Sequence, residues 1–439
     1  MNSKLKILGD FKAASLNLKN NLNNSLAELV SYNKIGNGIL NDAVFTLKDV
    51  YATSSGKTRS SSLILDNFEP SYNATVVEKL LAQGAVMVAK VNNDELALGG
   101  TGKHSAYGMI VNPKDPTRLV GGSSSGSAAT FDQNISFAIG SDTGDSVRLP
   151  ASYNGIVGFK PSYGAISRYG LFAYTSSLDT VAYFTHNVND SFYVSKALFG
   201  IDSKDMTSKE VAMKKLEKTK PKTVIAFDFS QFCDEEVNQS FTNTIKLMKQ
   251  QDIDVKIIQP NLDILRAIKP VYQIVSFSEA SSNLSNLTGI GFGVRESGND
   301  YQEIMTNTRS AKFGQMVSER LSLGSYFLYQ ENQEEIFLKA LKARRVIKDY
   351  LSDLHNQCDV LIYPSFGSIA PKINEIKSHD VVDYILTGAN LVGNPSISIP
   401  LGKKNNLPFN LEIDAKLYDD NKLLNYALYI EELLGGMNE

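Results

Sequence analysis

The stretch Gly121-Gly122-Ser123-Ser124-Ser125-Gly126-Ser127-Ala128-Ala129, followed by Ser141-Asp142-Thr143-Gly144-Asp145-Ser146-Val147-Arg148, is the most informative part of the sequence. Taken alone, the first run is compatible with a flexible Gly/Ser linker. However, it leads into the apolar residues 128–131, and the second Gly/Ser element follows a strand predicted at residues 135–139. A lysine, Lys48, also ends a short strand-like run upstream. These features indicate two glycine- and serine-rich turns of a folded site.

Short apolar runs alternate with helical patterns on both sides of this stretch. Helices are predicted at 74–83 and 235–250, and strands at 44–47, 85–89, 223–227, 255–258, 359–363 and 396–400. Strand–helix–strand is the repeating unit of α/β folds, so the pattern predicts one large α/β domain over residues 1–439. A loose leucine stripe predicts a helical N-terminal segment within residues 1–40. The polar, lysine-rich residues 203–222 predict a surface excursion.

The composition limits the possible partners. The 439 residues carry 44 basic and 47 acidic side chains, a net charge of −3, which argues against a chain that binds nucleic acid by itself. Cys233 and Cys358 lie far apart without a C-x-x-C pair, so we expect neither a metal site nor a disulfide framework. No apolar run approaches the ~18 residues of a membrane span, and no signal peptide is evident. We therefore expect a cytoplasmic protein without membrane contact.

The serines of the two turns need a base if they are to act in catalysis. A serine hydroxyl is a poor nucleophile until a base removes its proton. The usual base is histidine, but none of the four histidines lies in a recognisable serine motif. A buried lysine can replace histidine, because burial disfavours its charged form and lowers its pKa. Backbone N–H groups in glycine-rich turns could then stabilise an oxyanion.

The two Gly/Ser elements, together with Leu47-Lys48-Asp49, resemble the amidase signature family. The resemblance implies a single large domain with a mixed central β-sheet covered by helices. It also implies that Ser146 is the acyl-enzyme nucleophile, that Ser123 is a bridging serine after a cis peptide bond, and that Lys48 is the terminal base. The implied oxyanion hole consists of the N–H groups of Thr143, Gly144, Asp145 and Ser146.

Further segments make the resemblance more specific. They resemble the A-type subunits of the tRNA-dependent amidotransferases, which are the glutaminase subunits of these enzymes. These segments are residues 153–164, Ser176-Ser177-Leu178-Asp179, residues 278–284 and residues 390–395. The resemblance implies hydrolysis of glutamine to supply ammonia for converting Glu-tRNA(Gln) to Gln-tRNA(Gln), in a complex with two partner subunits, B and C. It implies no cofactor in this chain. ATP, Mg²⁺ and most of the tRNA contacts would belong to the partner.

Two charged residues are candidates for holding glutamine. An amino acid needs a cation for its carboxylate and an anion for its ammonium group, and a bidentate arginine suits the carboxylate. The resemblance implies these roles for Arg320, in Glu319-Arg320-Leu321, and for Asp383, in Val382-Asp383-Tyr384. The alternative for each is an ordinary surface charge on a helix.

The sequence also departs from the family pattern. Asp145 stands where a glycine usually precedes the nucleophile, Ser125 replaces another glycine, and Gly291-Phe292 replaces an Arg-Tyr step. A carboxylate directed into an oxyanion hole would oppose catalysis, so the Asp145 side chain must point away from it. Two other functions therefore stay open: a stand-alone amidase acting on small amides, and a catalytically inactive scaffold subunit. Gly99-Gly100-Thr101-Gly102-Lys103 lacks the spacing of a phosphate-binding loop and predicts only a glycine-rich turn.

Overall fold

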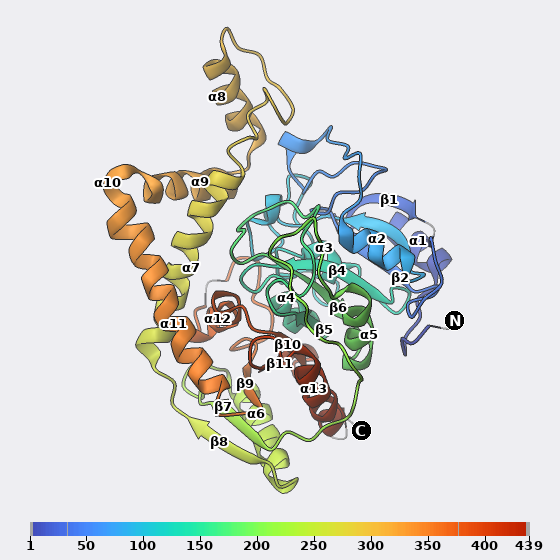
Figure 1. Cartoon of the computed structure of the whole chain (residues 1–439), viewed down its shortest axis with the longest axis vertical. Coiled ribbons are helices and arrows are strands. Elements are labelled where there is room, and N and C mark those ends of the chain that lie inside the picture. Colours follow the sequence, from blue (N-terminus) through green and yellow to red (C-terminus); the bar gives the residue numbers. More distant parts are fainter. Residues whose placement is uncertain (1–2, 33, 376, 436–439) are drawn as a thin grey trace.

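An eleven-stranded mixed β-sheet runs through the molecule in the computed structural model, which describes residues 3–32, 34–375 and 377–435 (Figure 1). Its strand order is β1-β3-β2-β4-β6-β5-β10-β11-β9-β7-β8. The strands are β1 (Leu26–Tyr32), β2 (Val44–Lys48), β3 (Val86–Val91), β4 (Phe137–Asp142), β5 (Val157–Lys160), β6 (Thr180–Thr185), β7 (Thr223–Phe227), β8 (Asp254–Ile258), β9 (Val360–Pro364), β10 (Ser396–Lys404) and β11 (Leu407–Asp414). The predicted α/β class and the mixed central sheet are confirmed.

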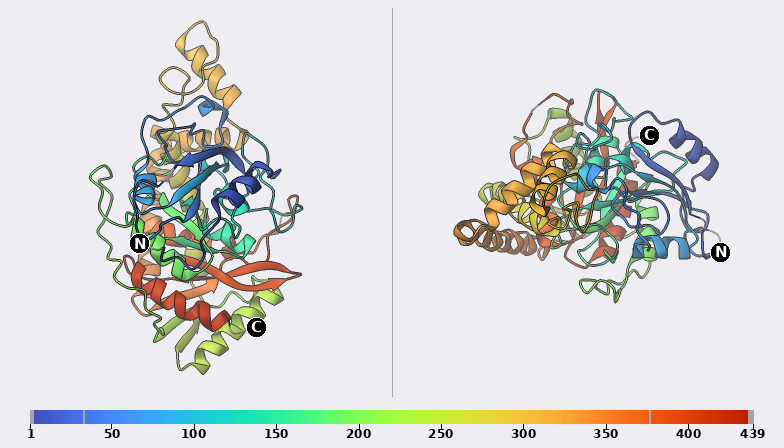
Figure 2. Two further views of the ribbon diagram at one scale, coloured as in Figure 1. Left: turned by 90° about the vertical axis from the view of Figure 1, so that its right-hand side faces the viewer. Right: turned by 90° about the horizontal axis from the view of Figure 1, so that it is seen from above.

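Helices flank this sheet. They are α1 (Phe11–Lys19), α2 (Thr75–Ala82), α3 (Ser125–Ala129), α4 (Arg148–Asn154), α5 (Val188–Leu198), α6 (Glu235–Gln250), α7 (Leu262–Asn283), α8 (Tyr301–Lys312), α9 (Gln315–Leu328), α10 (Gln330–Asn332), α11 (Lys339–His355), α12 (Ile385–Val392) and α13 (Asp420–Gly435). Three short 3₁₀ helices, η1 (Leu63–Leu65), η2 (Glu95–Ala97) and η4 (Asp380–Asp383), and one π-helix, η3 (Gln333–Leu338), complete the order of described elements. The long helices α7, α9 and α11 stand beside the sheet, and α8 projects at one end, far from α6 and β8 (Figures 1 and 2).

Strand β2 lies deep in the sheet and sets the position of the catalytic candidates. It pairs in parallel with β3 on one side and with β4 on the other, and Leu47 lies opposite Ile139 of β4. All five residues of β2 are buried, because apolar side chains pack on both faces of the sheet. A strand buried on both faces appears in sequence as a short continuous apolar run, which is why Val44 to Leu47 could be predicted. Lys48 ends this strand, as expected.

The predicted helical N-terminal segment is wrong in part. Only Phe11–Lys19 is helical, and Leu26–Tyr32 forms the edge strand β1, antiparallel to β3. The leucine stripe does not form one buried face, because Leu22 is 91% exposed whereas Leu18 is buried. Asn24 has a positive φ of 55°, outside the helical region, and turns the chain into the strand. The part of the prediction at residues 1–2 and 33 lies outside the described residues.

Two loop predictions are confirmed. Residues 203–222 contain no helix or strand and run over the surface with mostly exposed side chains. Residues 100–102 form bends, as expected of a glycine-rich turn. Among the described helices, none combines the length and the apolar character needed to cross a bilayer.

Candidate active site

Lys48 is the buried centre of the site. Its Nζ atom lies 2.8 Å from the Oγ atom of Ser123, 2.9 Å from that of Ser141 and 3.1 Å from that of Ser124. Burial lowers the pKa of Lys48 to about 7, and three surrounding carboxylates oppose this shift: Asp94, Asp142 and Asp179. A substantial fraction of Lys48 is therefore uncharged near neutral pH and can accept a proton.

The structure brings Ser123 and Ser146 to the same place. The Gly122–Ser123 peptide bond is cis, as the family resemblance implies. The N–H group of Ser124 donates to the carbonyl of Ser146 at 3.2 Å, which joins the two Gly/Ser elements. Ser146 is 5% exposed, and within the described residues its hydroxyl group makes no hydrogen bond. The Ser146 hydroxyl is thus uncommitted, while Ser123 directly contacts Lys48.

The backbone between β4 and α4 offers a row of free donors. In the described chain, none of the N–H groups of residues 143–146 donates to another protein group, whereas the next two, of Val147 and Arg148, both donate to the Asp142 carboxylate. Free N–H groups beside a serine are the donors that an oxyanion hole requires. The residues predicted for that role are therefore available for it.

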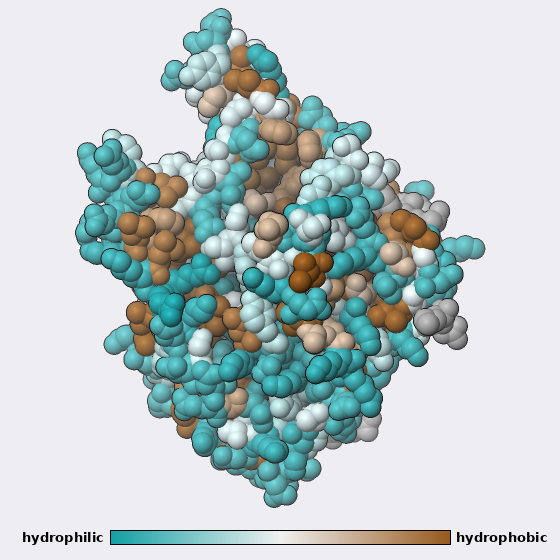
Figure 3. All heavy atoms as spheres, viewed as in Figure 1, coloured by the Kyte–Doolittle hydropathy of each residue, from teal (hydrophilic) through white to brown (hydrophobic). Residues whose placement is uncertain are grey.

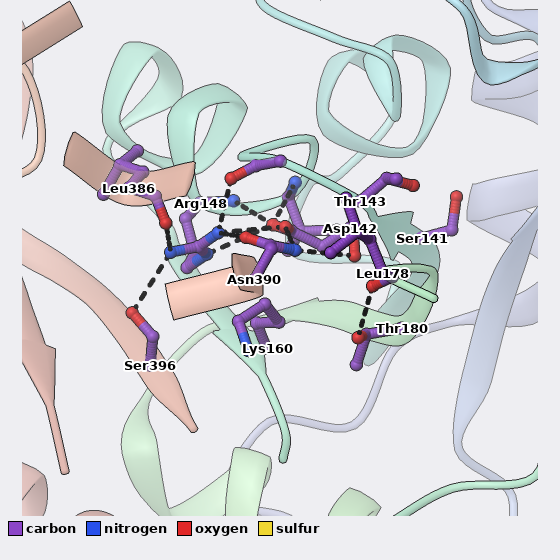
Figure 4. Close-up of polar contacts among 12 residues, drawn as sticks. Ser141, Asp142, Thr143, Arg148, Lys160, Leu178, Thr180, Leu386, Asn390 and Ser396 are labelled. Carbon is purple, nitrogen blue, oxygen red and sulfur yellow. Dashed lines mark hydrogen bonds and ion pairs between the residues drawn. The ribbon is translucent and has the colours of Figure 1, made fainter. Parts of the chain in front are cut away.

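A buried ion pair holds this turn in shape. The Arg148 guanidinium donates to the Asp142 carboxylate at 3.0 Å, to the Gly144 carbonyl at 2.9 Å and to the Asn390 side chain at 2.6 Å (Figure 4). Asn390, on α12, in turn donates to Asp142. Arg148 holds the pKa of Asp142 below its usual range, although burial acts in the opposite direction. Because both charges are fully buried and paired, the ion pair between Asp142 and Arg148 holds the turn that carries Ser146 in one conformation.

Two segments that the sequence singled out contact each other around the same turn. The Asp179 carboxylate accepts from the Thr143 hydroxyl at 2.7 Å, and burial raises its pKa to about 6. Ser177 donates to Glu279 through its N–H group at 2.9 Å and through its hydroxyl at 2.5 Å. The Ser-Ser-Leu-Asp segment therefore connects α7 to the oxyanion-hole turn.

Arg320 projects from α9 toward this turn. Its guanidinium lies 5.0 Å from the centre of the Phe277 ring and 3.4 Å from the Tyr174 hydroxyl. In the described chain it makes no ion pair within 4 Å, although it influences the pKa of Asp145. A half-buried arginine without a carboxylate partner is a suitable binding group for a substrate carboxylate. The alternative of an ordinary surface charge does not fit this environment.

Asp383 is already engaged by neighbouring groups of the protein. Its carboxylate accepts from the Ser378 hydroxyl at 2.8 Å and from the His379 N–H group at 3.0 Å, at the end of η4. Its Oδ1 atom is buried without a hydrogen bond and lies 3.6 Å from the His379 ring. Burial raises the pKa of Tyr153, and Asp145 and Asp383 add to this shift, so these three groups share one neighbourhood. The structure therefore leaves one buried carboxylate oxygen of Asp383 without a hydrogen bond.

Asp145 does not fill the row of free donors. Its carboxyl group accepts no hydrogen bond from the N–H groups of residues 143–146 in the described chain. Arg320, Tyr153 and Tyr272 each interact with it electrostatically. Burial raises the pKa of Asp145 to about 7. The Asp145 carboxyl group therefore leaves these N–H groups free.

Gly291-Phe292, the other departure from the family pattern, lies at an apolar cavity. The cavity has a volume of about 200 Å³, and Phe292, which is 52% exposed, lines it together with Leu96 and Phe172. The space-filling view shows apolar side chains in a hollow below the projecting α8 (Figure 3). This departure therefore alters an apolar wall and leaves the buried polar site unchanged.

Sequence reasoning missed several residues of the site. Ser124 and Ser141 contact Lys48, and Asn390 completes the brace of Arg148. Ser124 and Ser141 belong to the Gly/Ser elements and could have been proposed from proximity, whereas no local pattern links Asn390 to Arg148.

Comparisons with known proteins agree with this geometry. The amidase family profile matches residues 13–424. The chain is 38% identical to the A-type subunit of the glutamyl-tRNA(Gln) amidotransferase of Thermoanaerobacter pseudethanolicus, over 88% of this chain and 81% of the relative. It is 35% identical to the corresponding A-type protein of Sulfurisphaera tokodaii, over 90% and 86%.

Solved structures give the same picture of the fold. The crystal structure of the A-type glutamyl-tRNA(Gln) amidotransferase protein from Thermotoga maritima superposes with a TM-score of 0.80 at 31% identity, covering 96% of this chain and 91% of that one. A peptide amidase from Stenotrophomonas maltophilia has the same TM-score of 0.80 at 21% identity, covering 97% and 94%, and shares the fold alone.

Proposed function

The chain belongs to the amidase family, and from this premise we propose that it is the glutamine-hydrolysing subunit of a tRNA-dependent amidotransferase. It is an amidase-type hydrolase whose relatives are the A-type subunits of such enzymes. The observation that carries the proposal is the buried Lys48, 2.8 Å from Ser123, beside a row of free N–H groups that ends at Ser146.

The proposed reaction is the hydrolysis of glutamine to glutamate and ammonia. Uncharged Lys48 takes the proton of Ser123, and Ser123 takes the proton of Ser146, whose oxygen attacks the side-chain amide carbon. The N–H groups of residues 143–146 stabilise the oxyanion. The tetrahedral intermediate collapses, the C–N bond breaks, and the proton held by the lysine–serine pair leaves with ammonia. Water then attacks the glutamyl ester and restores Ser146.

Two charged side chains bind the two charged groups of glutamine. Arg320 takes the α-carboxylate of glutamine, because its guanidinium has no ion-pair partner within the described residues. Asp383 takes the α-ammonium group with its carboxylate, whose Oδ1 atom makes no hydrogen bond within the described residues. Arg320 interacts electrostatically with Asp145, and both Asp145 and Asp383 interact with Tyr153, which supports a position of the two binding groups near the Ser146 turn.

The released ammonia must be used by partner subunits. We propose that two further subunits, of the B and C types, assemble with this chain, and that the B-type partner uses ATP and Mg²⁺ to activate Glu-tRNA(Gln). The chain's net charge of −3 fits a protein that leaves most tRNA contacts to its partner.

Ser146→Ala tests this proposal in the native complex, purified with whatever partners accompany the chain. Glutamine-dependent amidation of Glu-tRNA(Gln) should fall at least about 10³-fold, whereas amidation with an ammonium salt as the nitrogen source should persist. Ser127→Ala is the matched control, because Ser127 is equally buried on α3 but donates to the Ile139 carbonyl.

Three outcomes would contradict the proposal. Glutamine-dependent amidation that survives Ser146→Ala would remove Ser146 from the mechanism. Efficient hydrolysis of simple amides by the chain alone, without co-purifying partners, would indicate a stand-alone amidase. A wild-type complex that uses only ammonium salt would indicate an inactive scaffold.

A further inference from the structure

Glu95 is a buried acidic residue outside the catalytic set. It begins the short helix η2 and is 2% exposed. One of its carboxyl oxygens accepts a hydrogen bond from the Ser62 hydroxyl, and the other accepts from the Gly314 N–H group at 2.8 Å. Burial raises the pKa of Glu95, and these two hydrogen bonds oppose that shift. The carboxyl group is therefore held at both oxygens by segments that lie far apart in sequence.

The contact with Gly314 lies at the start of α9, shortly after the projecting α8 (Figure 1). Gly314 is the N-cap of α9 and has no side chain with which to cap the helix. The first N–H groups of a helix lack partners within it, and they favour an acidic group nearby. A Cβ atom on Gly314 would lie 2.4 Å from the Oε2 atom of Glu95, so the close approach requires a glycine. Glu95 thus supplies the cap that Gly314 cannot provide.

Helix α9 also carries Arg320, the proposed binding group for the carboxylate of glutamine. The Nε group of Arg320 donates to the sulfur of Met316 at 3.1 Å, one turn closer to the start of the helix. Gly314 and Met316 line a cavity of about 310 Å³, and Glu95 and residues 103–106 line it as well. Because the first turn of α9 borders a cavity, side-chain packing does not support it on that side. The hydrogen bond to Glu95 joins it to the rest of the protein there.

The residue before Glu95 supports the catalytic side of the site. The N–H group of Asp94 donates to the carbonyl of Ser123 at 3.2 Å. The Asp94 carboxyl group accepts from the N–H groups of residues 101, 102 and 104 at 3.1 Å, 3.1 Å and 2.9 Å. Two consecutive residues therefore join the serine that contacts Lys48 to the helix that carries Arg320.

The backbone after Glu95 has an unfavourable conformation. Leu96 and Ala97 have positive φ values of 51° and 62°, which residues other than glycine rarely adopt. Such conformations persist only where the surrounding contacts enforce them, and they are concentrated at functional sites. The hydrogen bonds of Asp94 and Glu95 are contacts of this kind.

These contacts connect the reacting serines to the proposed binding arginine. We propose that Glu95 is a positioning residue that fixes the start of α9, and with it Arg320, relative to the turn of Ser123. Glu95 acts through Arg320 and not on the substrate itself. This inference rests on the proposed glutamine hydrolysis and deepens it, because it adds a residue that sets where the carboxylate of glutamine binds. Val317 and Leu321 pack in the core, so α9 should stay attached when the Glu95 contact is lost.

The experiment measures kcat and KM for L-glutamine in the native complex. Glu95→Ala should raise KM about tenfold with a much smaller change in kcat, because the start of α9 loses its hydrogen bond to a buried carboxyl group. Gly314→Ala should have the same effect from the other partner, since its methyl group would displace the Glu95 carboxyl group. Glu95→Gln keeps an acceptor for the Gly314 N–H group, so its KM should lie within about threefold of wild type.

Asp420→Ala is the matched control. Asp420 is also buried, and its carboxyl group also accepts from one hydroxyl and one N–H group, both of Ser162, at 2.6 Å and 2.8 Å. It lies at the start of α13, far from α9 (Figure 1). The KM for glutamine should therefore stay at the wild-type value in this variant.

A cycle with Arg320→Lys tests whether Glu95 acts through Arg320. If it does, the two changes affect one interaction and their effects should not add. In the Arg320→Lys background, Glu95→Ala should then change KM less than about threefold.

The outcomes separate this inference from the proposed function. An unchanged KM in Gly314→Ala and Glu95→Ala overturns the inference, and Gly314→Ala decides alone if Glu95→Ala does not fold. An undiminished effect in the Arg320→Lys background, or a loss confined to kcat, overturns it as well. In each of these cases the proposed function stands if wild type hydrolyses glutamine and Ser146→Ala does not. A wild-type complex without glutamine hydrolysis overturns both.

Discussion

The two sides of the site are built differently. On the chemical side, Lys48 and the serines around it come from β2, β4 and the turn before α3, are fully buried, and are joined by hydrogen bonds. On the proposed binding side, Arg320 and Asp383 come from α9 and η4 and are half-buried, and the Oδ1 atom of Asp383 makes no hydrogen bond within the described residues. A buried, satisfied network tolerates little change, whereas a partly open pocket can be altered residue by residue.

The largest expected effect comes from Lys48→Met, which removes the base from the buried side. The kcat for glutamine should fall about 10³-fold or more, and Ser123→Ala should cost about as much. The double variant should be no worse than either single variant, because the two residues act as a unit. In wild type, kcat should rise as pH rises through about 7, since only uncharged Lys48 accepts a proton. Additive losses in steady-state kinetics would contradict this coupling.

Arg148→Met tests the brace beneath the oxyanion-hole turn. Removing one partner of a buried ion pair leaves Asp142 charged and buried, which costs about 3–5 kcal/mol of unfolding free energy. Chemical denaturation should show a clearly lower midpoint. Arg345→Met is the control, because its pair with Asp349 on α11 is exposed and contributes about 0–1 kcal/mol. Equal destabilisation in both variants would show that the buried pair contributes no more to the free energy of unfolding than the exposed pair.

Arg320→Lys tests the binding side. A lysine cannot form the bidentate contact with a carboxylate, so the KM for glutamine should rise about tenfold while kcat changes less. Arg309→Lys is a matched control, since Arg309 also stacks on a phenylalanine, Phe313, at 4.8 Å, but donates to backbone carbonyls. If kcat falls while KM is unchanged, Arg320 is not a substrate-binding residue.

The smallest effect is expected for Ser141→Ala. This change removes one of three serine contacts of Lys48, at 2.9 Å, and leaves the contact with Ser123. One hydrogen bond contributes about 1 kcal/mol, so kcat should fall about fivefold to tenfold. A loss as large as that of Lys48→Met would place Ser141 in the proton relay itself.

Most of the sheet and the buried side of the site could be predicted from sequence. The strands at 44–47 and 223–227 are continuous apolar runs, and the Gly/Ser elements carry the family resemblance. The predicted N-terminal helix is too long, because leucines at helical spacing also occur in the edge strand β1. Residues 26–32 form a strand because they pair with β3, and this pairing cannot be seen in the local sequence. The contacts of Ser124, Ser141 and Asn390 are made across the fold, and local patterns do not encode them.

The sequence by itself determined the α/β class, the family and the candidates Lys48, Ser123 and Ser146, because apolar periodicity and short motifs are local properties of the chain. Only the tertiary structure decided the raised pKa of Asp145, the free state of the N–H groups at residues 143–146, and the lowered pKa of Lys48. Each of these depends on which groups surround a residue after folding. Burial and neighbouring charges arise from segments far apart in sequence, such as α4, α7 and α9, that meet only in the folded protein.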